Sequence, residues 1–173
     1  MLLTLATTVV IAAAPGPGDT ALHHSVSQFW NSLSNAPGSK PDIHQLQQLF
    51  ATNAVVFGQR QKDGNTSLHL QQAADFIASQ DRLKPYGFYE CEIAREVRIS
   101  GSFATVLSVV ESRRDATKQD ADFTGLNSMQ WANTGDGWQL VSLYYYLPAQ
   151  GETEFLLQGT PGQCLNTPAP TTN

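Results

Sequence analysis

The chain has 173 residues, of which 41% are hydrophobic and 14% are charged, and its formal net charge at pH 7 is -5. This length and apolar content suit one domain with a sizeable core. Its longest run of basic residues is the pair Arg113 and Arg114, so the basic cluster typical of nucleic-acid binding is missing and no nucleic-acid partner is expected.

The first 19 residues combine an apolar run with a Pro/Gly segment. Residues 1–14 are mostly apolar or small, and two Pro-Gly pairs follow at 15–18. This pattern resembles a signal peptide and predicts a secreted or periplasmic protein, although no Lys or Arg precedes Lys40. The alternative is an uncleaved tail on a cytoplasmic protein. The run is shorter than the roughly 20 residues of a membrane helix, so no membrane contact is expected beyond the signal segment.

A first amphipathic helix is expected just after this segment. Asp19 or Thr20 can cap its start by accepting a hydrogen bond from a free backbone N–H of the first turn. Its apolar residues then fall on one face at helical spacing: Leu22, Val26, Phe29, Trp30 and Leu33. The neighbouring His23 and His24 lie on the other face, where we expect them to point toward water or a groove rim.

Two more helices and a short strand are predicted before residue 85. Asp42, with a glutamine three residues later, resembles a capping box that opens a short second helix. A strand is expected at 54–58, followed by a turn at 62–65. A third helix is expected from about Ser67, ending before Pro85, because the residue before a proline leaves the helical region.

Four long strand-like runs then dominate the second half of the chain. Each is rich in the β-branched and aromatic residues that suit a pleated sheet, and turn-like residues separate them. They lie at 86–99, 103–113, 125–133 and 138–147. The order of helices first and strands afterwards is typical of an α+β fold, with helices gathered on one face of a curved sheet.

This element order and four sequence segments resemble the nuclear transport factor 2-like superfamily, particularly its SnoaL-like and related uncharacterised members. The segments are Gly87-Phe88-Tyr89-Glu90-Cys91-Glu92, Gly101-Ser102-Phe103-Ala104-Thr105-Val106, Gly125-Leu126-Asn127-Ser128-Met129-Gln130 and Gly137-Trp138-Gln139-Leu140. The resemblance implies a cone-shaped α+β fold: a curved antiparallel sheet with three N-terminal helices packed on its concave face and a pocket between them. It covers about 20–147, which leaves 1–19 as a signal peptide and flexible lead and 148–173 as a Pro/Thr-rich, partly disordered tail.

The resemblance carries no catalytic residues to this chain. Ketosteroid isomerases, limonene epoxide hydrolases, scytalone dehydratases and polyketide cyclases place Asp, His, Tyr or Arg in the cone. Here all four histidines precede the long strands, and the aspartates between 86 and 133 are confined to the polar loop 115–124. The catalytic residues are therefore unknown from the sequence, and no cofactor is expected.

Cys91 and Cys164 are the only two cysteines. Neither lies near a histidine at metal-ligand spacing, so no metal site is expected. In an exported protein they can form one disulfide that ties the tail to the sheet, and two free buried thiols are the alternative.

Strand periodicity assigns the acidic residues of the first long run to one face. Side chains alternate along a strand, so the run has a charged set and an apolar set. The charged set is Glu90, Glu92, Glu96 and Arg98, and the apolar set is Tyr89, Cys91, Ile93, Val97 and Ile99. Because the apolar set should face the core, we expect the glutamates in salt bridges on the outer face. The alternative is a carboxylate in the pocket that serves as a general base with a raised pKa.

The same periodicity selects the polar groups of the pocket. Ser108 and Gln130 fall on faces assigned inward, and Ser142 and Tyr144 share a face with the apolar Trp138. Trp30 should close the cone from the first helix. The predicted ligand-binding residues are Trp30, Tyr89, Ser108, Gln130, Ser142 and Tyr144.

Two functional classes fit this sequence. The favoured one is a domain that binds a small, partly apolar, uncharged ligand or a partner in the cone pocket. The alternative is a lyase, isomerase or hydrolase of the SnoaL-like type that uses an unrecognised carboxylate or tyrosine. A homodimer is expected in either case, because Leu107 and Val109 on an otherwise charged outer face indicate that part of it is covered, and because dimerisation through the sheet is common among the proteins this chain resembles.

Overall fold

The computed structural model describes residues 17–149 and 158–167, so the expected signal segment lies almost wholly outside the described residues. Three helices and six strands follow in the order α1 (Pro17–Leu33), α2 (Ile43–Leu49), β1 (Phe50–Lys62), β2 (Asn65–Gln72), α3 (Ala73–Gln80), β3 (Tyr89–Ser100), β4 (Phe103–Arg113), β5 (Phe123–Asn133) and β6 (Trp138–Leu147). The strands form one sheet in the order β2-β1-β6-β5-β4-β3. Only the β1–β6 pair within this sheet is parallel.

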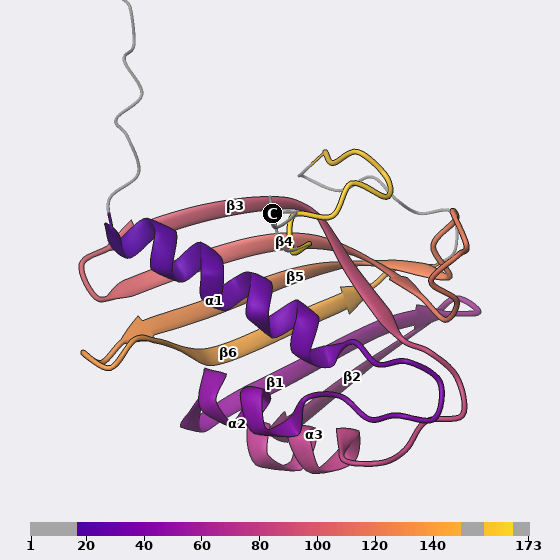
Figure 1. Ribbon diagram of the computed structural model, residues 1–173, viewed down its shortest axis with the longest axis horizontal. Helices are drawn as coiled ribbons and strands as arrows, with labels where there is room; N and C mark the ends of the chain where they lie inside the picture. The colour runs from indigo at the N-terminus through magenta and orange to yellow at the C-terminus, as the bar shows by residue number, and fades with distance from the viewer. Residues whose placement is uncertain (1–16, 150–157, 168–173) are drawn as a thin grey trace, which may run out of the picture.

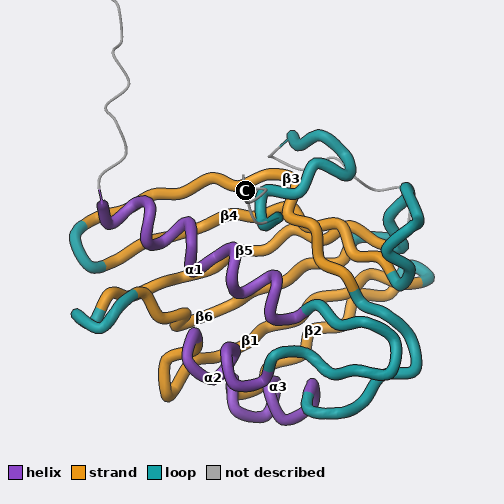
Figure 2. The backbone as a smooth tube through the Cα atoms, in the orientation of Figure 1, coloured by secondary structure: helices purple, strands orange, loops and turns teal. Residues whose placement is uncertain are grey.

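The helices gather on one face of the curved sheet, which confirms the expected cone-shaped α+β fold (Figures 1 and 2). Helix α1 buries Leu22, Val26 and Phe29 completely. The side-chain oxygen of Asp42 accepts a hydrogen bond from the backbone N–H of Gln45 at 2.9 Å, which confirms the predicted cap of α2. No helix among the described residues is long and apolar enough to span a membrane.

The prediction of a helix from Ser67 was wrong, because 65–72 forms the edge strand β2 and α3 begins only at Ala73. Asp63 and Gly64 both adopt positive φ, 52° and 75°, in a two-residue turn that pairs β2 antiparallel with β1. Strand β2 has no buried face, since Leu68 and Leu70 are 66% and 58% exposed. The alternation of Leu68, His69 and Leu70 is too short to indicate a strand, and it reports no buried face.

Two β-bulges reverse which side chains face the helices. The β3–β4 register shifts between Glu92 and Ala94, and the β5–β6 register shifts between Gln130 and Trp131. The extra residues are Ile93 on β3 and Val141 on β6. Each bulge inserts one residue, so side chains on its two sides alternate out of phase.

The disulfide Cys91–Cys164 joins the C-terminal segment to β3, which settles the question that the sequence left open. Asn166 lies beside it and is 4% exposed. Its side chain accepts a hydrogen bond from the N–H of Glu92 at 3.0 Å and donates one to the C=O of Glu90 at 2.9 Å. Residues 158–167 of the expected tail thus lie along the β3 edge of the sheet (Figure 1).

Candidate functional site

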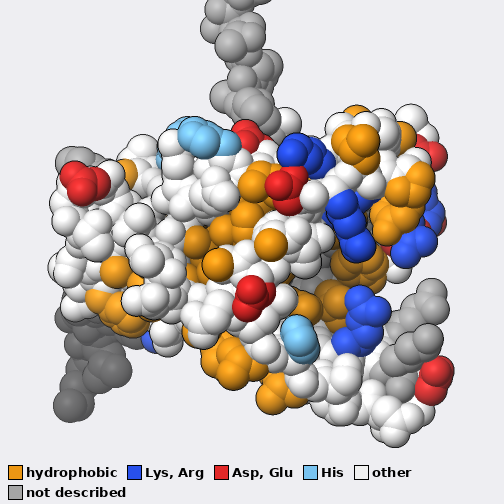
Figure 3. Space-filling model, turned by 90° about the horizontal axis from the view of Figure 1, so that it is seen from below, with side chains coloured by type: hydrophobic (Ala, Val, Ile, Leu, Met, Phe, Trp, Pro, Cys, Tyr) orange, Lys and Arg blue, Asp and Glu red, His pale blue; other side chains and the backbone are white. Residues whose placement is uncertain are grey.

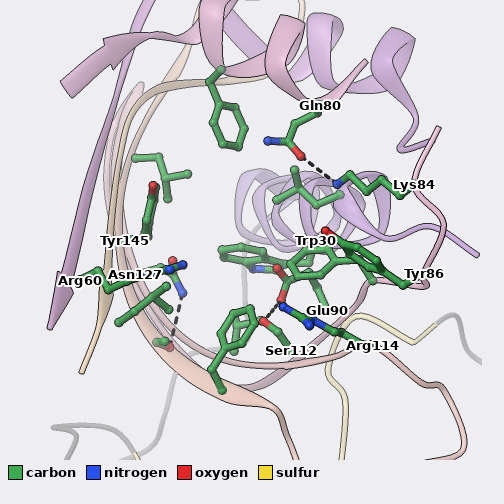
Figure 4. A pocket seen from close by; sticks show the side chains of 18 of the residues that line it. Trp30, Arg60, Gln80, Lys84, Tyr86, Glu90, Ser112, Arg114, Asn127 and Tyr145 are labelled. Carbon is green, nitrogen blue, oxygen red and sulfur yellow. Dashed lines mark hydrogen bonds between the residues drawn. The ribbon is translucent and has the colours of Figure 1, made fainter. Parts of the chain in front are cut away.

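A cavity of about 340 Å³ lies between the concave face of the sheet, the end of α1, α3 and the 81–88 segment. Its walls mix apolar side chains with a set of polar ones (Figure 4). The polar side chains are Arg60, Gln80, Arg82, Lys84, Tyr86, Glu90, Ser112, Arg114, Asn127 and Tyr145.

Glu90 places an ionisable carboxyl group in the wall of this cavity. It lies opposite Ser112 in the β3–β4 register, and the Ser112 hydroxyl donates a hydrogen bond of 2.7 Å to its Oε2 (Figure 4). Burial raises the pKa of Glu90 from 4.5 to about 7, although the Ser112 bond and the Lys84 charge act against this rise. The carboxyl group is therefore poised to gain or lose a proton near neutral pH.

Two further groups on the cavity wall have unused capacity to donate hydrogen bonds. The Nε1 of Trp30 is buried and has no hydrogen-bond partner, although this side chain lines the cavity. The Nδ2 of Asn127 makes only long contacts, 3.4 Å to the C=O of Ser108 and 3.5 Å to that of Gly125. Because an unpaired buried donor is costly, both groups suit a ligand that presents an acceptor.

Tyr145 reaches the cavity because a glycine lies opposite it. Gly58 pairs with Tyr145 in the β1–β6 register, and a Cβ at Gly58 would lie 2.1 Å from the phenol oxygen. The absence of that Cβ lets the ring lie across β1. In Figure 4, Tyr145, Asn127 and Arg60 lie on one side of the cavity, opposite Glu90 and Tyr86.

Four cationic side chains, Arg60, Arg82, Lys84 and Arg114, line the cavity. Lys84 donates a hydrogen bond of 3.0 Å to Oε1 of Gln80, and its Nζ lies 5.3 Å from the ring centre of Phe88. The guanidinium of Arg114 lies 5.2 Å from the ring centre of Tyr86. Partial burial, with the charge of Arg82 as the next cause, lowers the pKa of Lys84.

Glu92 faces the same side of the sheet as Glu90 but lies outside the cavity. It is fully buried, and Arg95 binds both of its carboxylate oxygens, with 2.9 Å from Nε to Oε1. The Ser108 hydroxyl also donates to Oε1. The Arg95 guanidinium donates in addition to the C=O of His23 at 2.8 Å and to Oγ of Ser27 at 3.0 Å. This saturated ion pair joins α1 to the sheet.

The outer-face assignment of Glu90 and Glu92 was wrong, and the bulge at Ile93 is the reason. Both side chains point to the concave face, while Tyr89 and Cys91 point outward. Beyond the bulge the predicted faces hold, with Val97 inward and the Glu96–Arg98 ion pair outward.

Of the six predicted ligand-binding residues, only Trp30 lines the cavity. Ser108 faces inward as predicted, but its hydroxyl is bound to Glu92. Gln130, Ser142 and Tyr144 lie on the outer face, where Ser142 donates to Gln130 at 3.1 Å and Tyr144 donates to the side chain of Gln59. The inward assignment of these three was wrong. Gln130 was assigned to the wrong face of β5, and the bulge at Val141 puts Ser142 and Tyr144 out of phase with Trp138.

Sequence periodicity placed Glu90 in the pocket only as the alternative, and it missed Ser112, Asn127, Tyr145 and the four cations. One signal was present: Glu92 and Arg95 are three residues apart, so they share a strand face only if a bulge lies between them. Once such a bulge is assumed, Glu90 and Glu92 move together to the inner face.

Comparison with known proteins gives structural matches alone. No family model matches the sequence, and no curated protein matches it. Among solved structures, a nuclear transport factor 2-like protein of unknown function from Shewanella baltica OS155 is 19% identical with a TM-score of 0.50, covering 74% of this chain and 94% of that one. A protein with a cystatin-like fold from Novosphingobium aromaticivorans is 14% identical with a TM-score of 0.56, covering 79% and 84%. The CaMKII hub of S. rosetta is 15% identical with a TM-score of 0.57, covering 78% and 99%.

The layers and the cavity define a cone-shaped α+β domain with an internal pocket. The matching structures identify this architecture as the nuclear transport factor 2-like, cystatin-like fold, which confirms the fold that the sequence resemblance implied. At these identities they establish the fold, and the function has to be argued from the site itself.

Proposed function

We propose that this protein binds a small, partly apolar ligand in the cavity beside Glu90. The observation that carries this proposal is an ionisable carboxyl group in a wall of mixed apolar and polar side chains, in a cavity that is also lined by Trp30 with its unpaired Nε1. A cavity of about 340 Å³ falls within the range of small-molecule sites, and a few convergent polar groups are what orients ligands in them.

Binding is tested with the uncharged dye N-phenyl-1-naphthylamine, whose fluorescence rises when it leaves water. We expect saturable binding to one site. Gly125→Leu should weaken it at least ten-fold, because Gly125 lines the cavity and a Cβ added there is crowded only by the flexible end of the Leu147 side chain, at 3.0 Å. The matched control is Gln130→Leu on the outer face of the same strand, which should leave the affinity unchanged. Equal losses in both variants, or no saturable binding, would refute the proposal.

A second candidate function is acid–base catalysis of the lyase, isomerase or hydrolase type. It is favoured by the carboxyl group of Glu90, whose pKa of about 7 suits a general base near neutral pH. In such a reaction Glu90 would take a proton from the substrate, while Trp30 Nε1 and Asn127 Nδ2 would donate to the oxygen on which negative charge develops. Ser112 would orient the carboxylate.

The probe for this second function is 5-nitrobenzisoxazole, which ring-opens when a base removes its C3 proton and the N–O bond breaks to give a cyanophenolate. We expect catalysis that rises with pH around a midpoint near 7, as Glu90 ionises. Glu90→Gln should reduce the rate at least a hundred-fold, since a single base contributes about 10²–10⁴. A rate that Glu90→Gln leaves unchanged would exclude Glu90 as the base.

Export and homodimerisation stay proposals. The Cys91–Cys164 disulfide supports a secreted or periplasmic location, because disulfides persist in oxidising compartments. N-terminal sequencing of exported material should find a start within residues 14–19.

The outer sheet face carries the aromatic pair Phe57 and Tyr144, whose ring centres are 6.3 Å apart. Native mass spectrometry should find two subunits, and a monomer at micromolar concentration would exclude the dimer.

A further inference from the structure

The basic side chains of this protein divide into two groups according to whether they have an acidic partner. The structure describes nine of the ten Lys and Arg side chains. Five of them form ion pairs with Asp or Glu: Lys40, Arg95, Arg98, Arg113 and Lys118. The other four are the cations that line the cavity, and none of these forms an ion pair with a described carboxylate. Although the chain has a net charge of -5, the unpaired positive charge of its described Lys and Arg side chains thus lies at one cavity.

The unpaired cations converge on the cavity from three separate segments. Arg60 lies on β1, Arg82 and Lys84 on the 81–88 segment, and Arg114 just beyond β4. Figure 4 shows Arg60 on one side of the cavity and Lys84 and Arg114 on the other. In Figure 3, Lys and Arg side chains border a hollow with hydrophobic walls on this side of the molecule.

Neutral contacts hold two of these cations in place. Lys84 is bound by Gln80 and lies over Phe88, and Arg114 lies over Tyr86. Such contacts fix the position of a charge without neutralising it. The acidic residue among them, Glu90, binds its proton up to about neutral pH. The cavity therefore holds four cationic side chains against one carboxyl group, that of Glu90.

We propose that the ligand of this cavity is an organic anion, with a compact apolar body and a carboxylate, sulfonate or phosphate group. The body contacts Trp30, Phe76 and Leu143, and the anionic group lies among the four cations. This inference rests on the proposed ligand-binding function and adds the charge of the ligand. It differs from the uncharged ligand expected from the sequence, because the inward direction of Arg60 and the gathering of the other three cations follow from the fold.

The test compares two dyes that share an aromatic body and differ in charge. 8-Anilinonaphthalene-1-sulfonate is N-phenyl-1-naphthylamine with an added sulfonate group. At low salt we expect the sulfonate dye to bind at least ten-fold more tightly, and this ratio should fall as salt rises, since ions screen exposed charges. A ratio near one would overturn the anion proposal while binding of the uncharged dye upholds the proposed function. If neither dye binds, both proposals fail.

Charge-neutralising variants locate the effect. Lys84→Gln, Arg60→Gln and Arg114→Gln should each weaken binding of the sulfonate dye by roughly three- to ten-fold, the effect of one charge near a protein surface, and should weaken binding of the uncharged dye by a smaller factor. The matched control is Lys40→Gln, which removes a cation paired with Asp81 outside the cavity. If Lys40→Gln weakens the sulfonate dye as much as Lys84→Gln does, the dye reports overall charge and the proposal is wrong. Three cavity variants make the test independent of the folding of any one.

Discussion

Glu90 and Glu92 lie two residues apart on the same strand, both on its concave side, yet their surroundings differ. Glu92 is fully buried, and Arg95 and Ser108 bind its carboxylate. Among the described residues, the carboxyl group of Glu90 has only the Ser112 hydroxyl as a hydrogen-bond partner, and it opens onto the cavity.

This difference shows that β3 uses Glu92 to stabilise the fold and places Glu90 in the candidate site. A buried carboxylate has to be paired, or its pKa rises until it is neutral. Glu92 is paired with Arg95, whereas the pKa of Glu90 is raised. A fully bonded carboxylate has nothing to offer a ligand, whereas a partly bonded one does. The predictions below test this division, beginning with the largest effect.

Glu92→Gln should lower the free energy of unfolding by about 3–5 kcal/mol, because it leaves the buried Arg95 without a counter-charge. Urea unfolding at pH 7 measures this loss. The matched control is Glu96→Gln on the same strand, whose partner Arg98 is 81% exposed. An exposed pair contributes about 0–1 kcal/mol, so the control should change little. Equal losses would mean that the buried pair has no special role.

Replacing both Cys91 and Cys164 by Ser should cost about 2–4 kcal/mol, because the disulfide closes a sequence separation of 73 residues. Cys91 lies between the two glutamates but points to the opposite face. Affinity for the uncharged dye should therefore change less than two-fold. Reducing the wild-type disulfide should give the same loss of stability. A large loss of dye binding would show that the C-terminal segment, although it is attached to the opposite face of β3, is needed to keep the cavity in its binding conformation.

The sequence predicted the layers of the molecule but not the composition of its site. Helix α1, the cap at Asp42 and the long strands follow from periodicity and local hydrogen bonding, which the residues themselves carry. A bulge depends on the register between two strands, and it has little local signature in an apolar run such as the one around Val141.

A small error in strand phase therefore changed the predicted site. Tyr145 lies in the cavity in place of Tyr144, and Glu90 lies there in place of Tyr89. The cationic group was likewise beyond the sequence, because Arg60, Lys84 and Arg114 are brought together by the fold alone.

Glu90→Gln should stabilise the protein at pH 8 by about 1–3 kcal/mol. Because the pKa of Glu90 is raised from 4.5 to about 7, the folded protein binds this proton more tightly than the unfolded chain does. The contribution of Glu90 to stability is thus fully present below about pH 4.5, is lost as the pH rises toward 7, and stays absent above that. Urea unfolding between pH 4 and pH 8 should show this decline in the wild type and its removal in the variant. A variant less stable than the wild type at pH 8 would mean that Glu90 is paired.

Ser112→Ala should have the smallest effect and should depend on pH. The Ser112 hydroxyl donates a hydrogen bond to the carboxyl group of Glu90. Burial raises the pKa of this group, and the Ser112 hydrogen bond lowers it. Its loss should raise that pKa further. The cost in stability should reach about 1 kcal/mol at pH 8, where Glu90 is ionised, and should be smaller at pH 5, because hydrogen bonds to charged groups are the stronger ones. Urea unfolding at the two pH values measures the difference.

Ser108→Ala is the matched variant for the other glutamate, since Ser108 donates to Glu92 in the same way. Arg95 remains bound to both oxygens of Glu92 when Ser108 is lost, so that carboxylate keeps its charge partner. Its cost should therefore be nearly the same at pH 5 and pH 8. If Ser112→Ala is as insensitive to pH as Ser108→Ala, Glu90 does not titrate between these values. The two carboxylates would then play the same structural role, and the case for Glu90 as a functional group would fail.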